Sequence, residues 1–198
     1  NDASIDWRSP AFSMWQTAIW DGAPGQRVSA SMVGYDAAFT PGIAFNLSVE
    51  NLILNNVDLD TDSIHLSLQG DDLTWTLNNA RYSSDISSSF AAPLTINVVA
   101  TNSEIHTLAR QIDSVTTLNI ESGAELRLFL CGQLGSLNPN QRLSFNRVGS
   151  AADIDGGTLL VDRSTVLFET GTNVFRVRNG GRLEITGAGS RLDTSILS

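Results

Sequence analysis

The sequence predicts an all-β protein built as a parallel β-helix, and three observations support this fold class. Apolar and polar residues alternate in short runs from residue 43 onward. A strand-and-corner template recurs in the second half, and Ser, Thr, Asn and Gly take the place of many charged residues, which make up only 17% of the 198-residue chain. Short strands of this kind also fit an antiparallel β-sandwich, which is the alternative fold.

Runs with an apolar residue at every second position predict strands with one buried face and one solvated face. The runs are Ile43, Phe45, Leu47 and Val49; Ile64, Leu66 and Leu68; Leu73, Trp75 and Leu77; and Leu94, Ile96 and Val98. Residues 103–115 differ, because their apolar residues follow helical spacing. This segment predicts a short helix, or a loop on the side of the scaffold.

A template of two apolar residues, a five-residue corner and a second strand recurs three times, starting at Leu118, Leu159 and Phe175. A coil of this kind cannot bury its apolar face alone, so we expect coils to stack with equivalent residues in columns. Within the third copy, Asn179-Gly180-Gly181 taken alone favours a hairpin turn. The recurrence of the template with different corners favours the β-helix.

We expect one structural domain that is part of a longer protein. Residues 1–42 hold three of the four tryptophans, and large rings at the end of a stack predict an aromatic N-terminal cap, with an irregular aromatic mini-core as the alternative. Residues 43–198 form the predicted solenoid, with a loop insertion around residues 130–155 that contains a strand at 142–147. Cys131 is the only cysteine, which excludes an intrachain disulfide.

The charge of the chain bears on its partners. The net charge is −9 and the isoelectric point is about 4.5. A nucleic-acid-binding protein normally carries a basic stripe, so nucleic acid is not an expected partner. The charge is uneven, with a net −10 over residues 1–140 and +1 over residues 141–198. No stretch has the length and apolarity of a membrane span.

Three acidic residues at alternate positions, Asp58, Asp60 and Asp62, form a candidate metal site. Carboxylates in this arrangement can present oxygen atoms to one side, and Ca²⁺ prefers several oxygen ligands. An EF-hand loop is excluded, because Ser63 and Gln69 stand where it needs Gly and Glu. Calcium is the only cofactor that the sequence suggests, and a solvated acidic corner is the alternative.

A second candidate site is the group of arginines Arg176, Arg178 and Arg182 near the C-terminus. Alternate residues share a strand face, so Arg176 and Arg178 could contact an anionic glycan together. The alternative is an ordinary cross-strand ion pair with Glu184.

No catalytic residues are predicted. Asp71 and Asp72 are the only adjacent carboxylate pair, and they are the candidates for a carbohydrate-active β-helix enzyme, which needs a general acid and a base or nucleophile. His65 and His106 are scattered, and no Gly-x-Ser-x-Gly motif accompanies them.

The segment 177–192, with the sequence VRNGGRLEITGAGSRL, resembles the strand repeats of bacterial autotransporter passenger domains and related surface proteins. The resemblance extends over residues 116–195 and is weaker elsewhere. It implies a right-handed parallel β-helix, export from the cell, and an adhesive or structural role. It assigns no catalytic residue.

These observations predict a secreted or bacterial outer-surface scaffold that is structural or adhesive. Its expected partners are other copies of the chain, through end-to-end self-association, or further coils of the same chain. A glycan or protein of a host or matrix is a further candidate partner. The alternatives are a polysaccharide hydrolase or lyase on a β-helix, and a glycan-binding β-sandwich module.

Overall fold

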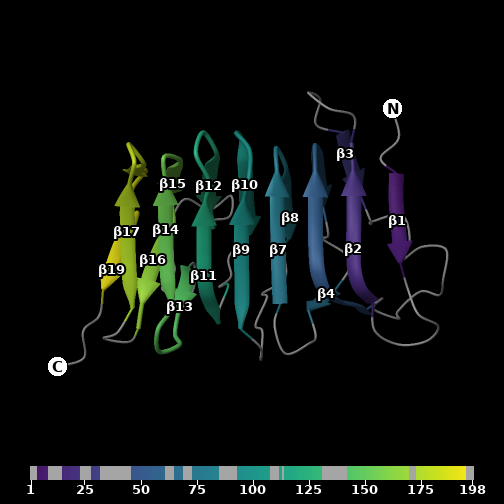
Figure 1. Ribbon diagram of the computed structural model, residues 1–198, viewed down its shortest axis with the longest axis horizontal. Helices are drawn as coiled ribbons and strands as arrows, with labels where there is room; N and C mark the ends of the chain where they lie inside the picture. The colour runs from purple at the N-terminus through teal and green to yellow at the C-terminus, as the bar shows by residue number, and fades with distance from the viewer. Residues whose placement is uncertain are drawn as a thin grey trace.

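The computed structural model describes residues 4–8, 15–22, 28–31, 46–60, 65–68, 73–84, 93–107, 112, 114–130, 142–169 and 173–194. All secondary-structure elements within these ranges are β-strands, which form three sheets. Strands from successive coils lie side by side along an elongated stack (Figure 1). All strand pairs among the described residues except β1–β2 are parallel, which confirms the parallel β-solenoid and excludes the β-sandwich and the sandwich module.

Two long sheets and one short sheet form the walls of the solenoid. The first, sheet A, contains β1 (Ser4–Arg8), β2 (Trp15–Asp21), β4 (Asn46–Asn55), β7 (Leu73–Asn78), β9 (Leu94–Val98), β11 (Val115–Ile120), β14 (Ala151–Asp155) and β17 (Val174–Arg178), with β6 (His65–Leu68) paired to β4. Sheet B contains β3 (Val28–Ser31), β5 (Val57–Asp60), β8 (Arg81–Ser84), β10 (Ser103–Thr107), β12 (Glu125–Phe129), β15 (Thr158–Asp162) and β18 (Arg182–Thr186). Sheet C contains β13 (Arg142–Phe145), β16 (Thr165–Phe168) and β19 (Arg191–Thr194).

The core consists of columns, meaning residues that pair in register across successive coils. One column of sheet A runs through Leu52, Trp75, Ile96, Leu118, Ala152 and Phe175. One column of sheet B runs through Leu59, Tyr82, Ile105, Leu128, Val161 and Ile185. All members except the last of each column are at most 2% exposed. The period-2 alternation therefore turns one face of β7 and one face of β9 toward this core, as predicted for the two runs at 73–77 and 94–98.

The corners between sheets A and B require left-handed backbone. Asn56, Asn79 and Asn179 have φ values of 52°, 48° and 52°, and asparagine tolerates this conformation better than most residues. The side-chain amide of Asn79 also donates a hydrogen bond to Oδ1 of Asn56 in the preceding coil at 2.9 Å. Corner residues thus stack on one another as the strands do.

The hairpin reading of Asn179-Gly180-Gly181 is excluded by the pairing. β17 pairs with β14 and β18 pairs with β15, so the two strands flanking this corner belong to different sheets. Asn179 and Gly180 both have positive φ, as the two central residues of a type I′ hairpin turn do. The same local geometry turns the chain from one wall of the solenoid to the next.

The helix predicted over residues 103–115 is wrong for its first part, because Ser103–Thr107 is strand β10, and residues 108–111 and 113 lie outside the described residues. Its inward positions are Ser103 and Ile105, both fully buried, and its outward positions carry Glu104 and His106. A strand with one inward apolar residue shows little alternation with a period of two. The apolar residues that follow β10 in the sequence have helical spacing, and this spacing led to the prediction of a helix.

The predicted strand-and-corner repeat is present in the structure, but its second copy begins in sheet B and not in sheet A, where the first and third copies begin. Leu159 and Val161 pair with Leu126 and Leu128 in sheet B, rather than with Leu118 and Ile120 in sheet A. The sheet A strand of that coil is β14, which carries Ala152 and Ile154 inward and has acidic outward positions.

The predicted insertion around residues 130–155 therefore contains two strands of the solenoid wall. Arg142–Phe145 is β13, within the strand predicted at 142–147, and Ala151–Asp155 is β14. Residues 131–141, which include Cys131, lie outside the described residues, so the loop insertion stays a prediction.

The predicted cap region also contains strands of both long sheets. β2 pairs in parallel with β4, β3 pairs in parallel with β5, and β1 pairs antiparallel with β2 at the edge of sheet A. The tryptophan side chains of this region lie outside what the structure describes, and the aromatic cap stays a prediction.

Candidate interaction site at the C-terminal coil

The C-terminal coil comprises β17, β18, β19 and their corners, residues 173–194. On one side its strands pair with β14, β15 and β16. In the part of the chain that the structure describes, no strand pairs with the opposite edges. These edges carry backbone N–H and C=O groups that can pair with a further strand.

The inward side chains of the C-terminal coil are partly exposed. Val177 and Ile185 are 44% and 45% exposed, whereas Ile154 and Val161, which precede them in the same columns, are 0% exposed. Phe175, Leu183 and Leu192 pack on the core but are only half-buried. The apolar core therefore reaches the surface at this end of the solenoid.

Arg178 anchors the C-terminal coil to the coil before it. Its Nε donates to Oδ1 of Asp153 at 2.9 Å and its Nη2 donates to Oδ2 of Asp153 at 3.0 Å, and Nη2 also lies 3.2 Å from Oδ2 of Asp155. These contacts raise the pKa of the Arg178 guanidinium, chiefly through the hydrogen bonds to Asp153. Arg178 does not pair with Glu184, the alternative partner that the sequence suggested, because Glu184 lies on β18 in a different sheet.

The other three arginines of this coil, Arg176, Arg182 and Arg191, are exposed, one in each sheet. Arg182 Nη2 lies 2.5 Å from Oε1 of Glu184, and Arg191 Nε lies 3.7 Å from Oδ2 of Asp193, so both ion pairs stay within one strand. In the preceding coils, ion pairs of arginine connect neighbouring coils. They are Asp58–Arg81, Arg127–Asp162 and Arg142–Glu169. Binding of an anionic glycan by Arg176, Arg178 and Arg182 stays a prediction.

A polar hollow of about 300 Å³ lies beside this coil on sheet A. Its lining includes Asn97, Asn119, Asp153, Asp155 and Arg178. Asn119 donates to Asn97 at 2.9 Å, and both carboxylates contact Arg178, so the polar groups of the hollow largely satisfy one another.

The predicted calcium site is only partly described. Asp58 lies on β5 and its Oδ2 is 3.6 Å from Nη2 of Arg81. Asp60 ends the same strand, and Asp62 lies outside the described residues. Within the described ranges no group of three or more His, Cys, Asp or Glu side chains could hold a metal ion. The calcium site stays a prediction.

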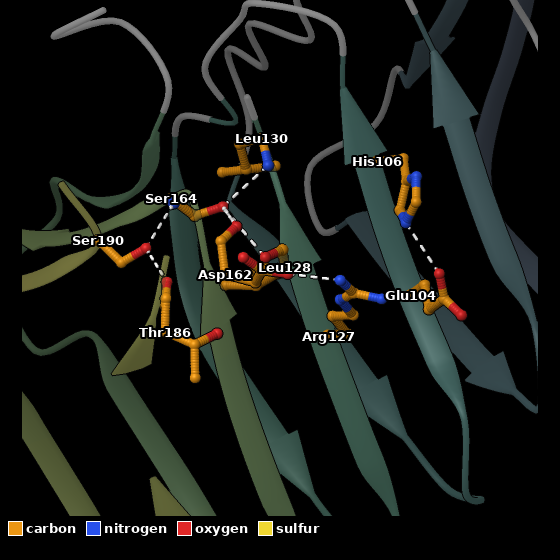
Figure 2. Close-up of polar contacts among 9 residues, drawn as sticks. All are labelled: Glu104, His106, Arg127, Leu128, Leu130, Asp162, Ser164, Thr186 and Ser190. Carbon is orange, nitrogen blue, oxygen red and sulfur yellow. Dashed lines mark hydrogen bonds and ion pairs between the residues drawn. The ribbon is translucent and has the colours of Figure 1, made fainter. Parts of the chain in front are cut away.

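Polar contacts on sheet B are structural in character (Figure 2). His106 Nε2 lies 2.8 Å from Oε2 of Glu104, two residues away on β10, and the His106 ring packs against Phe129 at 5.2 Å. The buried hydroxyl of Ser164 accepts a hydrogen bond from the Leu130 N–H at 2.8 Å. Its hydrogen bonds are thus made to backbone groups at a corner, as expected for a residue that fixes a turn.

The remaining sequence candidates for catalysis fall largely outside the description. Asp71 and Asp72 are not described, and of His65 only the backbone, in β6, is described. A carbohydrate-active enzyme therefore stays an alternative hypothesis. Among the described residues there is also no helix long and apolar enough to cross a membrane.

Fold and site together define a parallel β-solenoid whose last described coil is paired on one side within the described residues. Comparisons with models of protein families, with curated proteins and with solved structures gave no match. The resemblance to autotransporter repeats is consistent with the β-solenoid, and membership of that family is not shown.

Proposed function

We propose that this chain is a structural or adhesive scaffold of a secreted or cell-surface protein. The observation that carries the proposal is the open C-terminal coil, in which core columns end in half-exposed residues and sheet edges lack a neighbour within the described chain. Another set of parallel strands completes such an end. The solenoid is then a module that extends, or joins to, an elongated assembly.

Completion of this end is energetically favourable. Full burial of a Val or Ile side chain contributes about 1.5–3 kcal/mol, so covering the half-exposed Val177 and Ile185 contributes about 1 kcal/mol each. Backbone hydrogen bonds along β17 and β18 add directionality, because they form only with an aligned strand. This end of the solenoid should therefore bind a partner that presents aligned β-strands more tightly than a partner that presents only an apolar surface.

The outer faces of the coils suit display and adhesion. Outward columns of sheet A carry polar residues such as Thr76, Asn97, Asn119 and Asp153, which present a regular polar surface. We expect such a surface to bind a protein or a glycan of a host or matrix. The similarity of residues 177–192 to autotransporter strand repeats supports export to the outer surface of a bacterium.

Labelling of intact cells tests the proposed location. An antibody against the solenoid is expected to stain unpermeabilised cells of the source organism, or to detect the protein in the medium. External protease should remove the cell signal. Detection only after permeabilisation, with full protection from external protease, would contradict the proposal.

A further inference from the structure

We infer that the outer face of sheet B around Phe129 binds a polysaccharide that carries carboxylate or sulfate groups, with Arg163 as the anion-binding residue. The inference rests on the proposed function, in which the outer faces serve adhesion, and it names the class of ligand and its site. The strands that carry this site, β12 and β15, are each paired on both sides. The site therefore lies within the stack and uses no arginine of the C-terminal coil.

Phe129 is an aromatic residue at an outward position of β12. The inward residues of this strand, Leu126 and Leu128, are fully buried, whereas Phe129 is partly exposed. The other Phe, Tyr and Trp residues whose side chains the structure describes belong to the core or pack against it; they are Trp75, Tyr82, Phe145, Phe168 and Phe175. Packing of the core therefore does not account for Phe129, whose ring offers an apolar platform on the outer face.

The guanidinium of Arg163 lies beside the Phe129 ring from the next coil. Asp162 pairs in register with Phe129, and Arg163 follows Asp162 at the corner. Cζ of Arg163 is 5.6 Å from the centre of the ring, which is a cation–π distance, and the arginine is exposed. A guanidinium held by a ring face keeps its N–H donors in its own plane, where they can bind a carboxylate or a sulfate in a forked arrangement.

The backbone holds Arg163 in a conformation that arginine seldom adopts. Its φ is 47°, and its N–H donates to the carbonyl oxygen of Thr186 in the next coil at 3.2 Å. A Cβ at Gly187 would lie 2.8 Å from Cγ of Arg163, so this glycine leaves room for the stem of the arginine. Asn or Gly would adopt the left-handed conformation at lower cost, and an arginine at this corner therefore favours a use for its side chain.

The acids of this face are compensated by neighbours, and Arg163 is not. Asp162 accepts a hydrogen bond from Nη2 of Arg127, and Oε2 of Glu104 lies 2.8 Å from Nε2 of His106 (Figure 2). Among the described residues, Arg163 forms no ion pair with a carboxylate. In a chain of net charge −9, this corner is a point of uncompensated positive charge, and an anionic group complements it.

The alignment of the side chains along the stack favours a polysaccharide as the carrier of the anion. His106, Phe129 and Arg163 come from three successive coils, and the rings of His106 and Phe129 are 5.2 Å apart. Successive coils are about 4.8 Å apart, which is close to the length of one pyranose unit in an extended chain. A polysaccharide that lies along the stack can therefore place one sugar ring against Phe129 and the anionic group of the next sugar at Arg163.

Binding of defined polymers to the whole chain, measured by biolayer interferometry, tests this site. Polygalacturonate, which carries carboxylates, or dextran sulfate should bind, and uncharged dextran should not. The tighter of the two anionic polymers shows which anionic group the site prefers. Rising salt should weaken the binding, because it depends on charge.

Two substitutions locate the binding site. Arg163→Gln should weaken the binding about tenfold, as expected for the loss of a charge-assisted hydrogen bond. Phe129→Leu should weaken it about fivefold, because the ring that holds the guanidinium is lost. Arg191→Gln is the matched control, since it removes the same charge from an exposed position on sheet C, and it should leave the affinity unchanged. Thermal unfolding of the three variants should match that of the unmodified chain, because all three side chains lie on outer faces.

The inference is overturned if neither anionic polymer binds, or if uncharged dextran binds equally well. The same holds if Arg191→Gln weakens binding as much as Arg163→Gln, because a general effect of charge then explains the binding. Equal affinity for polyglutamate would assign the face to an acidic polypeptide and would also overturn the inference. A chain that binds no polymer but that labelling still places outside the cell would leave the scaffold proposal intact.

Discussion

At the residue scale, stability depends on corner residues whose contacts connect neighbouring coils. Ser164 is 0% exposed, and its Oγ lies 3.1 Å from the carbonyl oxygen of Leu128 and 2.8 Å from that of Asp162, besides accepting from the Leu130 N–H. A buried backbone group that loses its partner costs free energy, so such a residue is sensitive to truncation.

Ser164→Ala should lower the free energy of unfolding by about 1–3 kcal/mol, because the buried Leu130 N–H loses its acceptor. Urea unfolding followed by circular dichroism measures the loss. Ser122→Ala, at an exposed corner position, is the matched control and should change the midpoint little. Equal effects of the two substitutions would contradict the assigned role of Ser164.

Gly157 illustrates a position where two coils approach too closely for a side chain. A Cβ there would lie 2.5 Å from the backbone carbonyl oxygen of Glu121 and 2.6 Å from Cγ2 of Ile120. Gly157→Ala should therefore destabilise the fold by about 2–3 kcal/mol through forced backbone shifts. Gly123→Ala meets no atom within 4 Å and should cost only about 1 kcal/mol from its positive φ. Thermal unfolding of both variants distinguishes steric from conformational strain.

At the element scale, the contribution of an aromatic side chain to stability depends on the coil in which the side chain lies. Phe145 and Phe168 stack at 4.4 Å between ring centroids, and Phe168 contacts the ring of Phe175 at 5.9 Å. Phe145 is 0% exposed, whereas Phe175 lies in the open coil and is half-buried.

Phe145→Ala should destabilise the fold by about 3–5 kcal/mol, the usual cost of a buried aromatic cavity. Phe175→Ala should cost about half as much or less, because solvent already reaches this coil. Parallel urea titrations measure the difference. If the two losses are equal, the C-terminal coil is covered in solution by something other than the described chain.

Elements with several inward apolar residues could be predicted from the sequence, and those with few could not. The strands around Trp75 and Ile96 were predicted because three large apolar residues alternate in each. β10 was missed because Ile105 is its only inward apolar residue, and β14 was missed because Ala152 is small. The positive φ values of Asn179 and Gly180 suit both a hairpin and a corner, so only the pairing of the flanking strands distinguishes them.

The candidate interaction site could be predicted only in part. The arginine group was visible in the sequence, but the choice of Asp153 as the partner of Arg178 depends on which coil lies next to β17. The exposure of Val177 and Ile185 follows from the absence of a further described coil beside them, which no local sequence pattern encodes.

At the scale of the whole molecule, the coils differ in how many neighbours they have. Coils in the middle of the stack are covered on both sides, and the C-terminal coil is covered on one. Amide hydrogens of β17 and β18 should therefore exchange about tenfold faster, or more, than those of β9 and β12. Hydrogen-exchange mass spectrometry at a concentration where the chain is monomeric measures this. Uniform protection along the stack would contradict the open end.

The stacking of coils in parallel register is the central claim, and disulfide formation tests it most directly. Asn97 and Asn119 pair in register one coil apart, and Asp153 follows one coil later. Adjacent strands are about 4.8 Å apart, within the Cα range of a disulfide, whereas positions two coils apart are about 10 Å apart. In a Cys131→Ser background, Asn97→Cys with Asn119→Cys should form a disulfide on oxidation, and Asn97→Cys with Asp153→Cys should not. Absence of the first disulfide, or formation of the second in equal yield, would contradict the parallel β-solenoid.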